Sequence, residues 1–144
     1  MTDDEDEVPD WFWDVIESTR PRVAALEAWL QAQPRETVAR FALTYEDAAS
    51  DLAEYWNGIV VDGVGWSVDD MEDLCDWVVS QGHTYWLTVR SGAHPLVDAA
   101  REYHAESGAW DAIVASPEHR GYASPAGIGH GVYWTRFGED VPDD

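Results

Sequence analysis

Acidic side chains gather in one stretch of the chain, between Arg40 and Arg90. This stretch holds ten Asp and Glu residues and no Arg or Lys. Carboxylates grouped in this way can bind a hard cation, act as acid–base groups, or form a negative surface that attracts a cationic partner. The ten acids are Glu46, Asp47, Asp51, Glu54, Asp62, Asp69, Asp70, Glu72, Asp73 and Asp76.

A metal site is the first of these possibilities. Asp62, Asp69, Asp70 and Glu72 are oxygen ligands beside a glycine-containing loop. An EF-hand loop needs ligands at alternate positions, then a glycine and a distal glutamate, and DGVGWSVDDME lacks that spacing. The lone Cys75 excludes an internal disulfide and a cysteine-based zinc site. We therefore predict no metal and no cofactor.

Acid–base catalysis is the second possibility, but the sequence contains no known catalytic motif. The five histidines form no HExxH pair, and the chain has no GxSxG elbow, P-loop or CxxC motif. We predict no catalytic residue. One pocket remains as an alternative, in which the glycine-rich region after Pro117 folds around a ligand. Its residues would be His119, Arg120, His130 and Trp134.

A negative interaction surface is the interpretation we favour. The formal charge is −21, with 29 acids against eight bases, all of them Arg. Such a chain cannot neutralise phosphates, so we expect neither nucleic acid nor an anionic membrane as a partner. A basic protein is the partner this charge fits, and solubility alone is the simpler alternative. The predicted contact residues are Asp62, Asp69, Asp70, Glu72, Asp73, Asp76 and Trp77.

Most of these contact residues belong to one predicted helix. Ser67 is typical of an N-cap, Asp70 follows three residues later, and Gly82 suits the position after the helix. Its apolar arc includes Cys75, so we expect a buried structural thiol. Trp77 projects on the acidic side, where it is either covered by another part of the chain or exposed.

The remaining elements are also predicted to be helical. We expect a helix over 11–19 capped by Asp10, a second starting at Pro21, a third over 35–57, a two-turn helix over 83–90 and another after Pro95. Glycines favour an ordered loop over 59–66, with a short strand over 59–61 as the alternative. They also favour irregular backbone after Pro117, with VYWTRF as an extended arm. The predicted fold is mostly α, a compact bundle of about five helices with an irregular Gly-rich C-terminal arm.

The domain organisation follows from charge and hydropathy. Residues 1–7 and 139–144 are predicted to be acidic tails, the first of them disordered, around a single helical domain over 8–138. No run of about 18 apolar residues is present, and the N-terminus begins with acids. We expect a cytoplasmic protein. The sequence leaves its oligomeric state open.

Aromatic, glycine and acidic residues recur in a fixed order along the first two thirds of the chain. They are Phe12, Trp13, Tyr55, Trp56, Gly63, Ser67, Asp69, Asp70, Trp77, Gln81, Gly82 and Pro95. This order resembles the bacterial domain of unknown function 4240, over about residues 10–100, and departs from the family pattern at HTYWLTVR. The resemblance implies a helical fold and supplies no catalytic residues.

Charge and motif content together predict an acidic, non-catalytic interaction domain. Its partner would be a basic protein that it binds or masks, in the manner of an immunity protein or antitoxin. The alternative is a small-molecule-binding protein or enzyme, with a cleft beside the Asp69–Asp70 loop and the C-terminal arm.

Overall fold

The computed structural model describes residues 8–20, 22–52, 60–105 and 125–142. Within these ranges the chain is mostly helical, which confirms the predicted fold class in outline. The seven helices are α2 (Asp10–Thr19), α3 (Val23–Gln31), α4 (Arg35–Ser50), α5 (Val68–Ser80), α6 (His83–Ser91), α7 (Leu96–His104) and α9 (Pro125–Phe137). Strands β1 (Val60–Val61) and β2 (Val64–Gly65) form a small hairpin.

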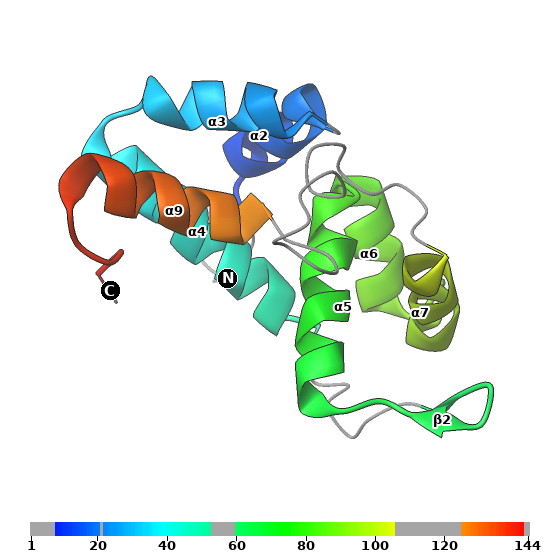
Figure 1. The fold of residues 1–144 in the computed structure, drawn as a ribbon. Coiled ribbons are helices and arrows are strands. Elements are labelled where there is room, and N and C mark those ends of the chain that lie inside the picture. Colours follow the sequence, from blue (N-terminus) through cyan, green and yellow to red (C-terminus); the bar gives the residue numbers. More distant parts are fainter. Residues whose placement is uncertain (1–7, 21, 53–59, 106–124, 143–144) are drawn as a thin grey trace, which may run out of the picture.

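The helices form two groups joined by the packing of α4 on α5 (Figure 1). One group holds α2, α3, α4 and α9, in which α9 packs on both α3 and α4. In the other group α5 packs on α6 and α7, and α7 also contacts β1. Helix α2 also joins the two groups, because the Trp13 ring centroid lies 5.0 Å from that of His83 and 5.2 Å from that of Trp86 on α6.

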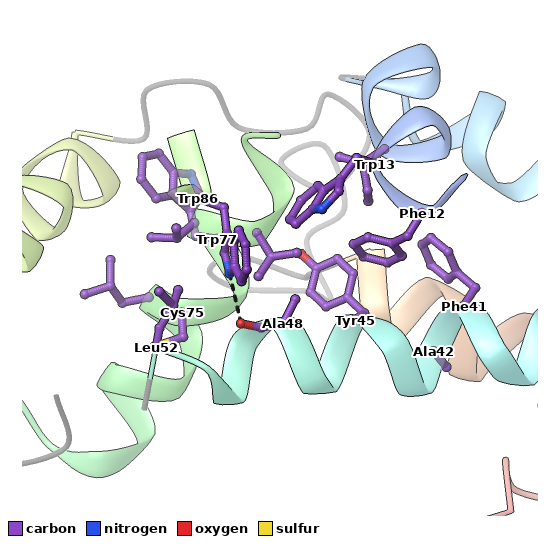
Figure 2. Close-up of a cluster of buried hydrophobic side chains, with 14 of the residues drawn as sticks. Phe12, Trp13, Phe41, Ala42, Tyr45, Ala48, Leu52, Cys75, Trp77 and Trp86 are labelled. Atoms are coloured by element: carbon purple, nitrogen blue, oxygen red, sulfur yellow. Dashed lines mark hydrogen bonds between the residues drawn. The ribbon is translucent and has the colours of Figure 1, made fainter. Parts of the chain in front are cut away.

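Aromatic rings and two long-range hydrogen bonds hold α4 in this position. The Phe12 ring centroid lies 5.4 Å from that of Phe41 and 5.8 Å from that of Tyr45. The Tyr45 hydroxyl donates to the Asp76 carbonyl oxygen at 2.6 Å. The Trp86 indole N–H donates to the Ala48 carbonyl oxygen at 3.0 Å (Figure 2). These bonds connect α4 to both α5 and α6 inside the core.

The C-terminal segment differs most from its prediction. Residues 125–137 form the regular helix α9, so the expected irregular arm with an extended VYWTRF is wrong. Each helical glycine costs about 1 kcal/mol relative to alanine, and packing offsets that cost. Val132 and Tyr133 are buried. A Cβ on Gly129 would lie 3.1 Å from the Phe41 ring, so this glycine permits the close approach of α9 to α4.

Two arginines connect α9 to the rest of its group. Arg136 Nη1 donates to the carbonyl oxygen of Leu30, in the last turn of α3, at 2.9 Å and to that of Gln33, just after the helix, at 2.7 Å. Helix ends leave carbonyls without partners, so this arginine caps α3 from another helix. Arg35 Nε donates to the Tyr133 hydroxyl at 2.8 Å, and the same side chain pairs with Glu139.

The segment before α5 is a hairpin, where a glycine loop was expected. Val60 pairs with Gly65 and Val61 with Val64. Asp62 and Gly63 have φ values of 53° and 85°. A two-residue hairpin loop whose central residues both have positive φ matches the right-handed twist of its strands, which explains why an Asp-Gly pair turns the chain here.

The helix boundaries agree in part with those predicted. Asp10 is the first residue of α2 after the N-cap Pro9, so its predicted role as the cap is wrong. Helix α6 confirms the helix expected over 83–90. The expected extension of α4 over 53–57 lies outside the described residues, as do residues 1–7 and 143–144 of the predicted tails.

The described end of the chain, residues 138–142, contacts the folded part. Val141 is 8% exposed and belongs to the core, and Glu139 pairs with Arg35. Across the described residues, none of the helices has the length and apolar character needed to cross a membrane.

Candidate functional site

The start of α5 is fixed by a capping box, as the sequence predicted. Ser67 Oγ accepts a hydrogen bond from the Asp70 backbone N–H at 3.1 Å, and Asp70 Oδ2 accepts one from the Ser67 backbone N–H at 3.2 Å. Two donors at the helix start are thereby satisfied. One oxygen of Asp70 is committed to this turn, so Asp70 serves the helix before it can serve any partner.

Trp77 lies in the core and is not a surface contact, so its predicted place in the partner-binding face is wrong. The side chain is 2% exposed. Its ring centroid lies 5.6 Å from that of Tyr85 on α6 and 5.7 Å from that of Tyr103 on α7. Because α6 and α7 both pack on α5, they cover a position that a helix-wheel projection assigns to the acidic side.

Cys75 confirms the prediction of a buried structural thiol. Burial raises the pKa of this thiol to about 12, and the neighbouring charges of Asp76 and Glu72 raise it further in the same direction. The nucleophilic form is the thiolate, so a thiol with this pKa stays protonated and unreactive near neutral pH.

The other predicted contact residues differ in how accessible they are. Asp62, at the hairpin turn, has a side chain that is 75% exposed and lies 3.4 Å from Arg101 Nη2. Glu72 and Asp73 are exposed on α5, and Asp76 is half-buried. The side chain of Asp69 lies outside the described residues. On α5, fewer of the predicted contact residues are therefore accessible than the sequence suggests, because Asp76 is half-buried and Trp77 is buried.

The structure brings bases to acids that the sequence separates from them. Arg101, on α7, contacts Asp98 Oδ1 at 3.1 Å as well as Asp62. Arg90, on α6, lies 3.8 Å from Asp51 Oδ2, with its guanidinium 5.1 Å from the Trp86 ring centroid. The acidic stretch between Arg40 and Arg90 is therefore partly neutralised in the folded protein by arginines from α6 and α7.

A second acidic group lies at the end of α4, outside the predicted face. Glu46 and Asp47 are exposed, and Asp51 follows one turn later as the C-cap. The pKa of Asp47 is raised, first by partial burial and then by the charges of Asp51 and Glu46. The last turn of α4 contains no base. We call Glu46, Asp47 and Asp51 the α4 carboxylates.

The position of the α4 carboxylates is unfavourable for the fold. The C-terminal end of a helix carries partial negative charge, so acids there are disfavoured. Like charges one turn apart, as Asp47 and Asp51 are, repel each other by roughly 0.2–0.5 kcal/mol. Arg90 and His130 lie close enough to Asp51 and Glu46 to offset part of this repulsion. The cost that remains at Asp47 is the feature that points to a role outside the fold.

Replacing Asp47 with Asn is expected to stabilise the protein at pH 7 by about 0.5 kcal/mol, because it removes that repulsion. A raised folded-state pKa means that ionised Asp47 costs stability above that pKa, and the cost disappears as pH falls through it. The gain should therefore be present at pH 7 and absent near pH 3, below the ordinary Asp pKa of 3.8.

Urea denaturation at both pH values measures this difference. Glu27→Gln is the matched control, because Glu27 is an exposed acid on α3. A variant at Asp47 that is no more stable than the wild type at pH 7 would show that the charges do not repel.

Two of the four predicted pocket residues lie on one face of α9. His130 and Trp134 are four residues apart, so their side chains are neighbours on the helix surface. His130 Nε2 lies 2.6 Å from Glu46 Oε2, which places this face beside the α4 carboxylates. Trp134 is 56% exposed. His119 and Arg120 lie outside the described residues.

Sequence reasoning missed a second polar group, between α6 and α7. The Tyr85 hydroxyl donates to Glu102 Oε1, and His94 Nε2 lies 3.4 Å from the same oxygen. Burial raises the pKa of Tyr85, and its hydrogen bond to Glu102 adds to the shift. His94 and Glu102 lie eight residues apart, so no short-range pattern in the sequence brings them together.

The described part of the chain holds no group of three or more His, Cys, Asp or Glu side chains arranged to bind a metal ion.

Comparisons of the chain with protein-family models, with curated proteins and with solved structures found no match. The resemblance to the bacterial domain of unknown function 4240 therefore stays a prediction, and the geometry of the site alone carries the functional argument.

Proposed function

We propose that this chain is a non-catalytic interaction domain that binds a basic protein partner through carboxylates on α4 and α5. The partner would be a protein whose activity is masked when its basic surface is covered, as in immunity-protein or antitoxin pairs. The α4 carboxylates form the centre of the surface, and the exposed Glu72 and Asp73 of α5 extend it.

The observation that supports this proposal is the gathering of like charges at the negative end of α4. Asp47 occupies a position that neither the helix dipole nor the charges of Asp51 and Glu46 favour. Glu46 and Asp51 have partial partners within the fold, His130 at 2.6 Å and Arg90 at 3.8 Å. A cationic partner would relieve this repulsion on binding. Complementary charge also speeds encounter and discourages wrong partners.

The alternative of a small-molecule cleft has less support. It required the Asp69–Asp70 turn and the C-terminal arm to lie together. The C-terminal segment is instead the helix α9, which packs on α3 and α4. The start of α5 follows the hairpin at the other end of the described fold (Figure 1).

The proposal is tested with fluorescein-labelled 15-residue peptides, one rich in Arg and Lys, one neutral and one acidic. Fluorescence anisotropy at 50 mM salt should show binding of the basic peptide alone. A triple variant, Glu46→Gln, Asp47→Asn and Asp51→Asn, should bind it at least about tenfold more weakly, which corresponds to 1.4 kcal/mol.

A matched control separates this surface from overall charge. Asp10→Asn, Asp14→Asn and Glu27→Gln change the net charge equally, at exposed positions on α2 and α3. This control should lose little affinity. Equal losses in the two triple variants would mean that net charge, and not the α4 surface, attracts the peptide.

A further inference from the structure

One face of α9 is open and carries a large exposed aromatic side chain. Trp134 is 56% exposed, whereas the other described tryptophans are buried or half-buried. Gly131 is exposed on the same helix, and a Cβ placed there would meet no atom within 4 Å. A flat backbone beside an exposed indole lets another chain approach closely.

Carboxylates adjoin this face of α9. His130, one turn before Trp134, contacts Glu46 at 2.6 Å. The charge of Glu46 in turn contributes to the raised pKa of Asp47, so the two carboxylates lie close together. The surface therefore continues from Trp134 through His130 to the α4 carboxylates.

The two arginines nearest this end of α9 are already engaged. Arg136 donates to two carbonyl oxygens at the C-terminal end of α3, and Arg35 pairs with Glu139 and donates to the Tyr133 hydroxyl. Their cationic groups are directed to partners within the fold. An approaching chain therefore meets carboxylates and an aromatic ring at this surface.

We propose that the open α9 face around Trp134 anchors an apolar side chain of the partner, while the adjoining α4 carboxylates bind Arg or Lys residues flanking it. The occupant is thus a basic amphipathic segment of a protein. This inference rests on the proposed function and adds to it an apolar contact, which charge alone does not provide. Large aromatic residues at the centre of an interface often dominate binding energy, and cations also stack on indole rings.

The experiment compares two fluorescein-labelled peptides of equal charge. The first places Leu residues three and four positions apart between Arg residues, and the second replaces each Leu with Ser. Trp134→Ala should raise the Kd of the first peptide by about tenfold or more, as expected for an aromatic anchor. It should change the Kd of the second peptide by less than about threefold.

Two further variants separate anchoring from loss of fold. Gly131→Gln places a bulky polar side chain on the open face, where it meets no protein atom, so it should weaken binding of the Leu peptide without loss of helicity. Leu87→Ala removes an apolar side chain that is 42% exposed on α6, and should leave both affinities unchanged.

The outcomes distinguish this inference from the proposed function. If neutralising the α4 carboxylates weakens binding and Trp134→Ala does not, the anchor is overturned and the charged surface stands. If the wild type binds neither peptide, both proposals are overturned. A preference of the wild type for the Leu peptide that survives both Trp134→Ala and Gly131→Gln would place the apolar contact elsewhere and overturn the inference.

Discussion

Replacing Trp77 with Ala is expected to destabilise the fold by about 3–5 kcal/mol, the range for removing a buried aromatic side chain. The ring is 2% exposed and lies between Tyr85 and Tyr103, so it joins α5 to both α6 and α7. Thermal or urea denaturation followed by circular dichroism measures the loss. Trp77→Phe should cost less, because it retains a ring in the same space.

Trp134→Ala is the matched control for this core substitution. The Trp134 side chain is 56% exposed, so its removal should change stability by less than about 1 kcal/mol. Similar small losses in both variants would contradict the placement of Trp77 in the core. Such a result would mean that Trp77 is exposed on the acidic side of α5, the position that a helix-wheel projection assigns to it.

The second large effect is expected in the rate of association. Complementary charges raise association rates above the values typical of neutral surfaces, and salt screens this effect. Neutralising the three α4 carboxylates should lower the association rate constant for the basic peptide by about tenfold at 50 mM salt. The difference should shrink as the salt concentration rises to 500 mM.

Stopped-flow fluorescence of the labelled peptide measures these rates. The α2–α3 control, with Asp10, Asp14 and Glu27 neutralised, should keep most of the wild-type rate. If the two variants slow association equally at every salt concentration, the whole charge of the protein steers the peptide and the α4 surface has no special role.

Local features were the ones that the sequence predicted well. The start of α5 depends on Ser67 and Asp70, which lie one turn apart, so its capping box is visible in the sequence. The same holds for the apolar arc that buries Cys75. Helix caps and apolar arcs depend on residues within a few positions of each other, so the local sequence is enough to predict them.

Helix α9 could not be predicted in this way, because its glycines are unfavourable locally and its stabilising contacts are distant. Gly129 is matched to the Phe41 ring, and Arg136 caps a helix about 100 residues earlier in the chain. Periodicity within residues 125–137 contains neither contact. Tertiary packing therefore decides the structure of this segment.

The candidate site shows the same limit. Counting charges located the acidic stretch, but it could not show that Arg101 and Arg90 return to contact Asp62 and Asp51. It also could not show that α6 and α7 cover Trp77. The i, i+4 spacing of Asp47 and Asp51 is a signal in the sequence that could have located the α4 carboxylates, but the prediction did not use it.

The most direct test of the account is parallel affinity capture from cells that produce this protein, with identification by mass spectrometry. Wild type, the α4 triple variant and the α2–α3 control would be immobilised at equal density, and each captured protein would then be purified and its Kd measured. We predict one basic protein that binds wild type and control alike and binds the α4 variant at least about tenfold more weakly. Recovery of the same proteins on all three, with equal affinities, would contradict the central claim.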